Sequence, residues 1–197
     1  MIHDDYCVCE NCQKKLSPKF IPFTHDDVKC LAIYEYDDVM KSLIYQYKGC
    51  YDIVLSEVFM SQIKRELSLL YKGYMVIPVP SYKTEDIKRE FNHVIEIFSY
   101  LNNPIERLIE KTENIKQSSL KKSERANIGK YLKMSNIEIV RNKKILLVDD
   151  IHTTGSTIKA CLKLIKQGQP KDIKVLVIAK TRDDKQHIRN HAKSIGL

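Results

Sequence analysis

The chain has 197 residues, of which 43% are hydrophobic and 29% charged, as in one soluble domain and not in a low-complexity chain. No apolar run approaches the roughly 18–20 residues of a membrane span, and the N-terminal residues lack the pattern of a secretory signal, so we expect a cytoplasmic protein without membrane insertion. The net charge of +8 is uneven: residues 1–115 carry 14 basic and 18 acidic side chains, residues 116–144 nine and two, and residues 145–197 ten and five. A basic half is typical of proteins that bind phosphate-bearing ligands or nucleic acid, and equally of a solvated face.

Four of the six cysteines lie within the first 30 residues. The segment Cys9-Glu-Asn-Cys12 has the spacing with which two thiolates bind one Zn²⁺, and Cys7 and Cys30 could complete such a site. A second C-x-x-C pair is absent, so the alternatives are a degenerate zinc ribbon and a set of free thiols. We therefore divide the chain into a cysteine-rich, zinc-ribbon-like segment over residues 1–30 and a larger domain over residues 31–197.

The first half of the larger domain alternates strand and helix patterns. Residues 31–36 predict a strand, and residues 37–47 predict a short helix that ends at Gly49. Apolar side chains recur at helical spacing over residues 52–70 and predict one long amphipathic helix. A strand over residues 74–80 follows, and a second helical spacing of apolar side chains predicts a helix from Ile87 to Leu101.

The second half begins with residues 105–135, whose polar, basic and aperiodic sequence predicts a long mobile stretch. Residues 137–140, 144–151 and 173–180 predict strands, and residues 158–165 predict a helix with Cys161 on its apolar face. Alternating strands and helices predict an α/β fold with a parallel sheet covered on both faces. Ligands of such folds bind beyond the carboxyl ends of the strands, here after Pro80 and after Asp150.

Residues 145–157, Ile-Leu-Leu-Val-Asp-Asp-Ile-His-Thr-Thr-Gly-Ser-Thr, carry the most specific pattern. A buried strand ends on Asp149 and Asp150, whose charges need hydroxyls, a cation or backbone donors as partners. A turn rich in hydroxyls then leads into a helix, where backbone N–H groups form a cradle for an anion and Gly155 permits close approach. Two carboxylates beside a phosphate cradle suit a sugar phosphate.

This stretch resembles the phosphoribosyl-pyrophosphate (PRPP) signature of type I phosphoribosyltransferases. The resemblance implies that Asp149 and Asp150 contact the ribose hydroxyls, and that Mg²⁺ bridges the pyrophosphate and ribose oxygens. It also implies that the 5′-phosphate is held by Thr153, Thr154, Gly155, Ser156 and Thr157. His152 stands where the family has an aliphatic residue, and we assign it no catalytic role.

The order of several further motifs resembles the ComF family of competence proteins over essentially the whole chain. These motifs are the cysteine knuckle, Lys48-Gly49, Ile77-Pro-Val-Pro80, Arg89-Glu-Phe-Asn92, Gln117 and Ser-Glu-Arg125-Ala-Asn127. The resemblance implies a type I phosphoribosyltransferase-like sheet, with candidates for the pyrophosphate site and the lid at Lys83, Arg89, Asn92 and Arg125. Glu90 replaces the family's glycine, which puts a carboxylate near the expected anion site.

The resemblance implies a role in DNA uptake during natural transformation, with a helicase of single-stranded DNA import as a partner. One alternative is a PRPP-binding protein, with or without phosphoribosyltransferase activity. The other is a single-stranded-DNA-binding adaptor that uses the fold as a scaffold and the basic residues 116–144 as a strand contact. The acidic pair Asp149-Asp150 favours the first function and the basic stretch favours the second. The sequence identifies neither an acceptor base nor a catalytic residue.

Overall fold

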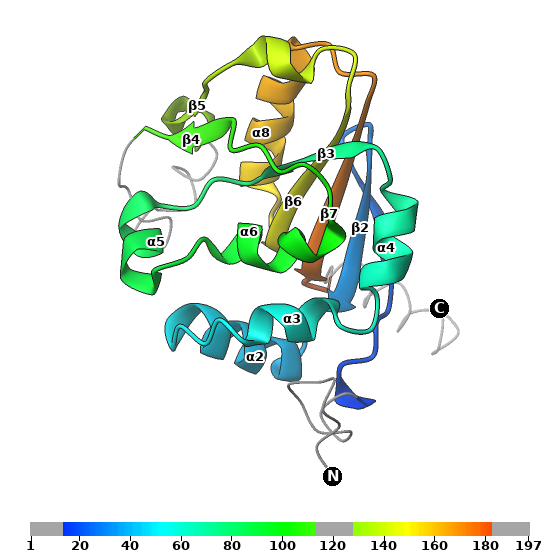
Figure 1. The fold of residues 1–197 in the computed structure, drawn as a ribbon, viewed down its shortest axis with the longest axis vertical. Coiled ribbons are helices and arrows are strands. Elements are labelled where there is room, and N and C mark those ends of the chain that lie inside the picture. Colours follow the sequence, from blue (N-terminus) through cyan, green and yellow to red (C-terminus); the bar gives the residue numbers. More distant parts are fainter. Residues whose placement is uncertain (1–13, 113–127, 183–197) are drawn as a thin grey trace, which may run out of the picture.

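The computed structural model describes residues 14–112 and 128–182 (Figure 1). A five-stranded sheet has the order β1-β2-β7-β6-β3. Its first two strands form an antiparallel hairpin, and β2, β7, β6 and β3 run parallel. The strands are β1 (Ile21–His25), β2 (Val28–Glu35), β3 (Tyr74–Pro78), β6 (Lys144–His152) and β7 (Asp172–Lys180). The predicted α/β class with a largely parallel sheet is confirmed.

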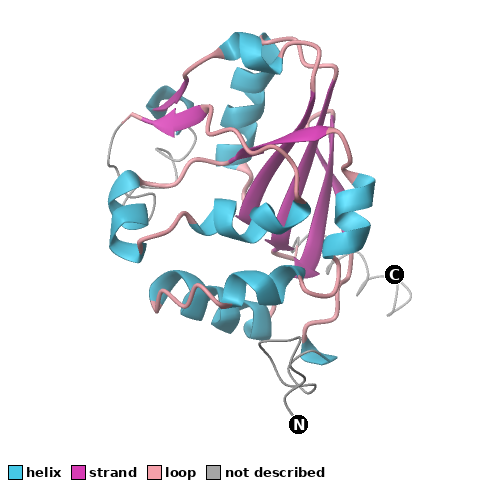
Figure 2. Cartoon of the chain, in the orientation of Figure 1, coloured by secondary structure: helices cyan, strands magenta, loops and turns pink. Residues whose placement is uncertain are grey.

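Helices cover both faces of this sheet, as Figure 2 shows. They are α2 (Asp38–Gly49), α3 (Leu55–Met60), α4 (Lys64–Leu70), α5 (Lys83–Arg89), α6 (His93–Phe98) and α8 (Ser156–Gln167), with short 3-10 turns η1 (Ser99–Leu101), η3 (Ile128–Tyr131) and η4 (Ile137–Val140). Two core clusters form because side chains alternate along each strand. Leu146 and Val148 of β6 pack with α2, α3, α4 and α6, whereas Ile145 and Leu147 pack with α8.

The single helix predicted over residues 52–70 is wrong, because the chain makes two helices, α3 and α4, separated by a turn. Ile63 has a non-helical φ of −136° but is only 3% exposed. Phe59, Ile63 and Leu67 all reach the same core cluster. The helical spacing of apolar residues therefore continues across the turn between α3 and α4, so this spacing alone could not reveal the turn.

The helix predicted from Ile87 to Leu101 is also two helices, α5 and α6. Glu90 adopts a left-handed φ of 66° and ends α5, and the Asn92 side chain then caps α6 by accepting from the Ile95 N–H at 2.9 Å. Ile87 is 76% exposed and does not belong to the apolar face. A left-handed residue is easiest for glycine, which gives a conformational reason for the glycine that the family has at position 90.

Two predictions for residues 105–140 are corrected as well. Residues 137–140 form the 3-10 turn η4 rather than a strand, because the Asn136 side chain accepts from the Glu138 N–H and caps the turn. The stretch over residues 105–135 is not wholly irregular, since β4 (Ile109–Lys111) pairs with β5 (Leu132–Met134) in a second small sheet.

The hairpin of β1 and β2 joins the segment before residue 30 to the main sheet. Strand β2 runs through Cys30 and pairs along its length with β7. Along the described parts of the chain, no helix combines the length and apolar character needed to cross a membrane. In Figure 1, α2 and α3 lie just beyond the arrowheads of the parallel strands, so helices border the sheet edge where ligands of such folds bind.

Candidate functional site

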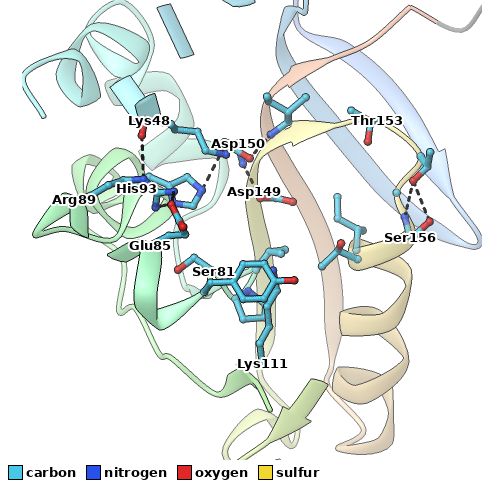
Figure 3. Close-up of a pocket in the computed structure, with 18 residues that line it drawn as sticks. Lys48, Ser81, Glu85, Arg89, His93, Lys111, Asp149, Asp150, Thr153 and Ser156 are labelled. Atoms are coloured by element: carbon cyan, nitrogen blue, oxygen red, sulfur yellow. Dashed lines mark hydrogen bonds and ion pairs between the residues drawn. The ribbon is translucent and has the colours of Figure 1, made fainter. Parts of the chain in front are cut away.

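A pocket of about 370 Å³ lies at the carboxyl end of β6 (Figure 3). One side, which we call the motif wall, comes from a single segment and consists of Asp149–Ile151 and Thr153–Ile158. The other side, the opposite wall, comes from five separate segments: Lys48, Val79–Tyr82, Glu85 with Arg89, His93 and Lys111. All seven residues predicted to bind PRPP line this one pocket.

The loop of the motif wall owes its shape to Gly155, which has a φ of +70° and stands at the N-terminus of α8. A Cβ at this position would lie 2.5 Å from Cε1 of His25 and 2.7 Å from Nε2 of His152. The glycine thus lets the loop lie directly on two imidazole rings. Beside it the hydroxyls of Thr154 and Ser156 lie 3.0 Å apart, and the 12-residue helix α8 begins at Ser156. Hydroxyls and unpaired N–H groups at a helix start favour an anion.

Asp150 is the more strongly held of the two carboxylates. It is buried, its Oδ2 accepts from Lys48 Nζ at 2.5 Å, and His93 Nε2 lies 3.5 Å away. The Ile151 N–H donates to Oδ1 at 2.8 Å. Burial acts to raise the pKa of Asp150, but the charge of Lys48 and the hydrogen bonds from Lys48 and the Ile151 N–H hold it well below its usual range.

Asp149 behaves in the opposite way. Burial and the neighbouring charge of Asp150 raise its pKa well above the usual range, although Lys48 opposes this. Its Oδ1 accepts from the Asp150 N–H at 2.9 Å. A ligand that brings hydroxyl donors or a cation to this carboxylate would favour its charged form. The pair therefore suits ribose hydroxyls and a hard cation such as Mg²⁺, which prefers carboxylate oxygens.

Arg89 and His93 form the buried part of the opposite wall. The Arg89 side chain is 8% exposed, donates from Nε to the Lys48 carbonyl at 3.2 Å, and pairs with Asp86 at 3.4 Å. Burial lowers the pKa of His93 to about 3, and the charges of Lys48 and Arg89 act in the same direction. The imidazole is consequently neutral at ordinary pH. Arg89 both lines the pocket and joins α5 to the end of α2.

Lys111 was not predicted from the sequence. It lies on β4, is half-buried, and holds Nζ 3.9 Å from the centroid of the Tyr82 ring. Burial lowers its pKa. In Figure 3 it stands across the pocket from the loop of the motif wall. The sequence around it is aperiodic, so only its basic character was visible there.

The four candidates for the pyrophosphate site and the lid have different places. Arg89 lines the pocket, as described. Lys83 is 72% exposed, pairs with Glu110 at 3.7 Å and, with Asn92, lines a small neighbouring cavity that shares Lys111 with the pocket. Asn92 donates to Ser81 Oγ at 2.8 Å and so shapes the loop after β3 without lining the pocket. Arg125 lies outside the described residues.

Glu90, which stands where the family has glycine, is exposed and does not line the pocket. The carboxylate on the opposite wall is that of Glu85, which lies 3.7 Å from Arg89. Several residues that line the pocket were not predicted from the sequence. Ser81 and Tyr82 nevertheless follow Pro80, where the predicted parallel sheet placed the ligand site. His93 and Glu85 had no such signal.

The zinc hypothesis stays a prediction, because Cys7, Cys9 and Cys12 lie outside the described residues. Cys30 is 6% exposed on β2, its Sγ donates to the Val28 carbonyl at 3.3 Å, and burial raises the pKa of its thiol to about 11. This environment favours the neutral thiol, whereas zinc binds the thiolate. Within residues 14–112 and 128–182, no three His, Cys, Asp or Glu side chains are gathered as a metal site.

Comparisons with known proteins agree with this geometry. Residues 93–196 match the model of the phosphoribosyl transferase domain. The chain is 31% identical over 206 residues to the competence protein ComFC of Streptococcus pneumoniae, covering 90% of each chain. It is 27% identical over 141 residues to the competence protein ComFC of Bacillus subtilis, covering 70% of this chain and 58% of that relative.

Solved structures show more distant likenesses. A hypoxanthine phosphoribosyltransferase from Staphylococcus aureus has 13% identity and a TM-score of 0.41, with 66% of this chain and 67% of that chain covered. A hypoxanthine phosphoribosyl transferase of Trypanosoma cruzi has 14% identity and a TM-score of 0.43, with 64% and 65% covered. These likenesses are too distant to indicate a substrate.

Proposed function

Because the chain belongs to the ComF family of competence proteins and carries a phosphoribosyl transferase domain, we propose that its pocket binds PRPP or a related ribose phosphate. The observation that carries this proposal is the placement of Asp149, Asp150 and the Gly155 loop in one pocket with the cations Lys48, Arg89 and Lys111. Acidic and basic groups face each other across that pocket. A ligand with both hydroxyls and phosphates satisfies both walls.

The two walls suggest an orientation for the ligand. The 5′-phosphate is held by the hydroxyls and N–H groups from Thr153 to Thr157, and the ribose hydroxyls donate to Asp149 and Asp150. The pyrophosphate then extends toward Lys111 and Arg89 on the opposite wall. Mg²⁺, when bound, neutralises charge on the pyrophosphate while it keeps several water ligands.

Phosphoribosyl transfer would rely on the same residues. Charge develops on the ribose ring carbon and on the leaving pyrophosphate, so the protein must position both and stabilise the leaving group. Lys111 and Arg89 are the cations that face the leaving group in this orientation. The proposal of PRPP binding does not depend on turnover.

Isothermal titration with PRPP and Mg²⁺ tests the proposal. We expect saturable binding, and we expect the double variant Asp149→Asn/Asp150→Asn to bind at least about tenfold more weakly, roughly 1.4 kcal/mol, because the ribose loses both charged acceptors. Glu138→Gln is the matched control, since Glu138 pairs with Arg141 on the exposed turn η4. Equal affinity of the folded double variant and the wild type would contradict the ribose assignment.

Both relatives are competence proteins, which supports a role in DNA uptake, in which a helicase of single-stranded DNA import would be a partner. A second candidate function, binding of single-stranded DNA, is favoured by exposed lysines at the amino end of the sheet. Lys143 precedes β6 and Lys144 begins it, whereas Asp150 lies near the other end of the strand. Six residues of strand span about 20 Å, so DNA held there would leave the pocket open.

Single-stranded DNA binding is tested by its salt dependence. The candidate lysines are Lys116, Lys121, Lys122, Lys130, Lys133, Lys143 and Lys144, of which the first three lie outside the described residues. The logarithm of the binding constant should fall linearly with the logarithm of the salt concentration, with a slope that becomes shallower by about 0.7 for each phosphate contact removed. The triple variant Lys133→Glu/Lys143→Glu/Lys144→Glu should therefore flatten this slope while PRPP binding persists. Full competition between PRPP and an oligonucleotide would contradict two separate surfaces.

A further inference from the structure

The β1–β2 hairpin meets the motif wall outside the pocket. His25, the last residue of β1, lies against Gly155 although it does not line the pocket itself. We propose that His25 is a positioning residue, which holds the Gly155 loop (residues 153–157) in the shape that receives a phosphate group. This inference deepens the proposed function, because the same loop is the proposed site of the 5′-phosphate.

Two imidazole rings support Gly155. A Cβ at this glycine would lie 2.5 Å from Cε1 and 2.8 Å from Nδ1 of His25, so the ring packs closely against the loop backbone. His152 approaches the same point, with Nε2 at 2.7 Å. The two rings meet edge to face with their centroids 5.7 Å apart, and the Phe23 ring packs against His152 at 4.7 Å. Rings from β1 and from the end of β6 therefore form one aromatic layer next to the loop.

Ion pairs attach the hairpin turn to α8, the helix that begins within the Gly155 loop. Asp26 lies 3.6 Å from Lys159, and Asp27 contacts the ammonium group of Lys166. Both lysines belong to α8. Exposed pairs of this kind contribute little to stability one by one. Together they join the turn to the helix at two points, and His25 directly precedes that turn.

The contact between His25 and the loop is one of packing. Its Nε2 is buried, and among the residues that the structure describes it has no hydrogen-bond partner. The ring atom nearest to the Cβ position of Gly155 is a carbon, Cε1. Gly155 has a φ of +70°, in a region that glycine enters and leaves easily. A ring packed against this glycine restricts it before the ligand arrives, so less ordering remains to be done on binding.

Amide hydrogen exchange tests this role without any ligand. The Lys159 N–H donates to the Gly155 carbonyl at 2.8 Å, so its exchange rate reports whether Gly155 stays in place. We expect His25→Ala to speed this exchange at least about tenfold. The Val79 N–H, which donates to the Val148 carbonyl at 2.8 Å between β3 and β6, should change less than about twofold. Unchanged exchange at Lys159, or equal acceleration of both amides, would overturn the proposal.

Ligand selectivity gives a second readout. His25→Ala should weaken the binding of ribose 5-phosphate at least about fivefold and change that of magnesium pyrophosphate less than about twofold, because only the first ligand depends on the Gly155 loop. His25→Phe keeps a flat ring against the loop and should recover most of the loss. Thr24→Ala is the matched control, since Thr24 is exposed on the other face of β1.

The outcomes separate this inference from the proposed function. Absence of ribose 5-phosphate binding in the wild type would contradict the proposed function, while exchange at Lys159 still decides whether His25 holds the loop. Accelerated exchange in His25→Ala with unchanged ribose 5-phosphate affinity would overturn the role of His25 in phosphate binding. Failure of His25→Phe to restore affinity would overturn ring packing as its cause.

Discussion

The two walls of the pocket differ in how the chain builds them. The motif wall is one segment, residues 149–158, in which a strand, a turn and a helix follow directly upon one another. The opposite wall joins side chains from α2, the segment after β3, α5, α6 and β4. One of its contacts to the motif wall, between Lys48 and Asp150, links residues 102 positions apart. A local motif carries its own geometry, whereas an assembled wall exists only once the chain is folded.

The walls also differ in how their charges are satisfied. On the motif wall, backbone N–H groups donate to both carboxylates, and the hydroxyls of Thr154 and Ser156 contact each other. On the opposite wall, Arg89 is already held by Glu85 and Asp86, and Lys111 lies against an aromatic ring. We therefore expect changes in the motif wall to affect folding and binding together, and changes in the opposite wall to affect mainly binding or pH dependence.

The largest effect is expected for Gly155→Val. The new side chain would meet His25 and His152 at less than 3 Å in a left-handed backbone, so we expect the free energy of unfolding to fall by about 2–4 kcal/mol. PRPP affinity should also fall at least about tenfold, because the loop must move to make room. Urea unfolding and isothermal titration measure the two effects.

Removal of the obstructing ring tests the cause of the Gly155 effect. Gly155→Ala combined with His25→Ala should recover part of the stability that Gly155→Ala loses alone, since the new Cβ would lie closest to His25, at 2.5 Å from its Cε1. Strictly additive losses in the double variant would show that backbone strain, and not the imidazole, is responsible.

A smaller effect is expected on the opposite wall for Lys111→Ala. Loss of its ammonium should lower PRPP affinity by about five- to tenfold and leave ribose 5-phosphate binding nearly unchanged, because only PRPP carries the pyrophosphate. Lys83→Ala is a matched control, since Lys83 is exposed and does not line the pocket. Equal losses for the two variants, or a loss shared by both ligands, would count against this orientation of the pyrophosphate.

The last expected effect is on unfolding, and it concerns His93 and the pH dependence of stability. Because burial lowers its pKa to about 3, His93 contributes stability that is complete above its unfolded pKa of about 6.5 and is lost as the pH falls toward 3. We expect the unfolding free energy to fall by about 1–2 kcal/mol from pH 7.5 to pH 5 on this account. In urea unfolding at the two pH values, the free energy of unfolding of His93→Gln should fall correspondingly less than that of the wild type. The contribution of Asp149 to stability has the opposite pH dependence, but it is present in both proteins and cancels when they are compared.

The elements that the sequence predicted best are those whose pattern is local. Strand β6, the turn after it and α8 lie where the apolar run, the hydroxyl-rich turn and the helical spacing predicted them. The helices over residues 52–101 were predicted less well, because the chain breaks at Ile63 and at Glu90. At Ile63 the buried apolar spacing continues through the turn, since α3 and α4 face one core, whereas Ile87 before Glu90 is exposed.

The sequence by itself determined the α/β class, the family and the motif wall, because adjacent residues specify a strand that ends on two carboxylates and a turn that exposes N–H groups. Only the tertiary structure decided that Lys48 and His93 would contact Asp150, that Lys111 would line the same pocket, and that Lys83 and Asn92 would line a neighbouring cavity. The physical reason is that the direction of a helix and the partner of a strand depend on the whole core. A side chain 40 or 100 residues away in sequence therefore reaches the site only through packing that no single segment encodes.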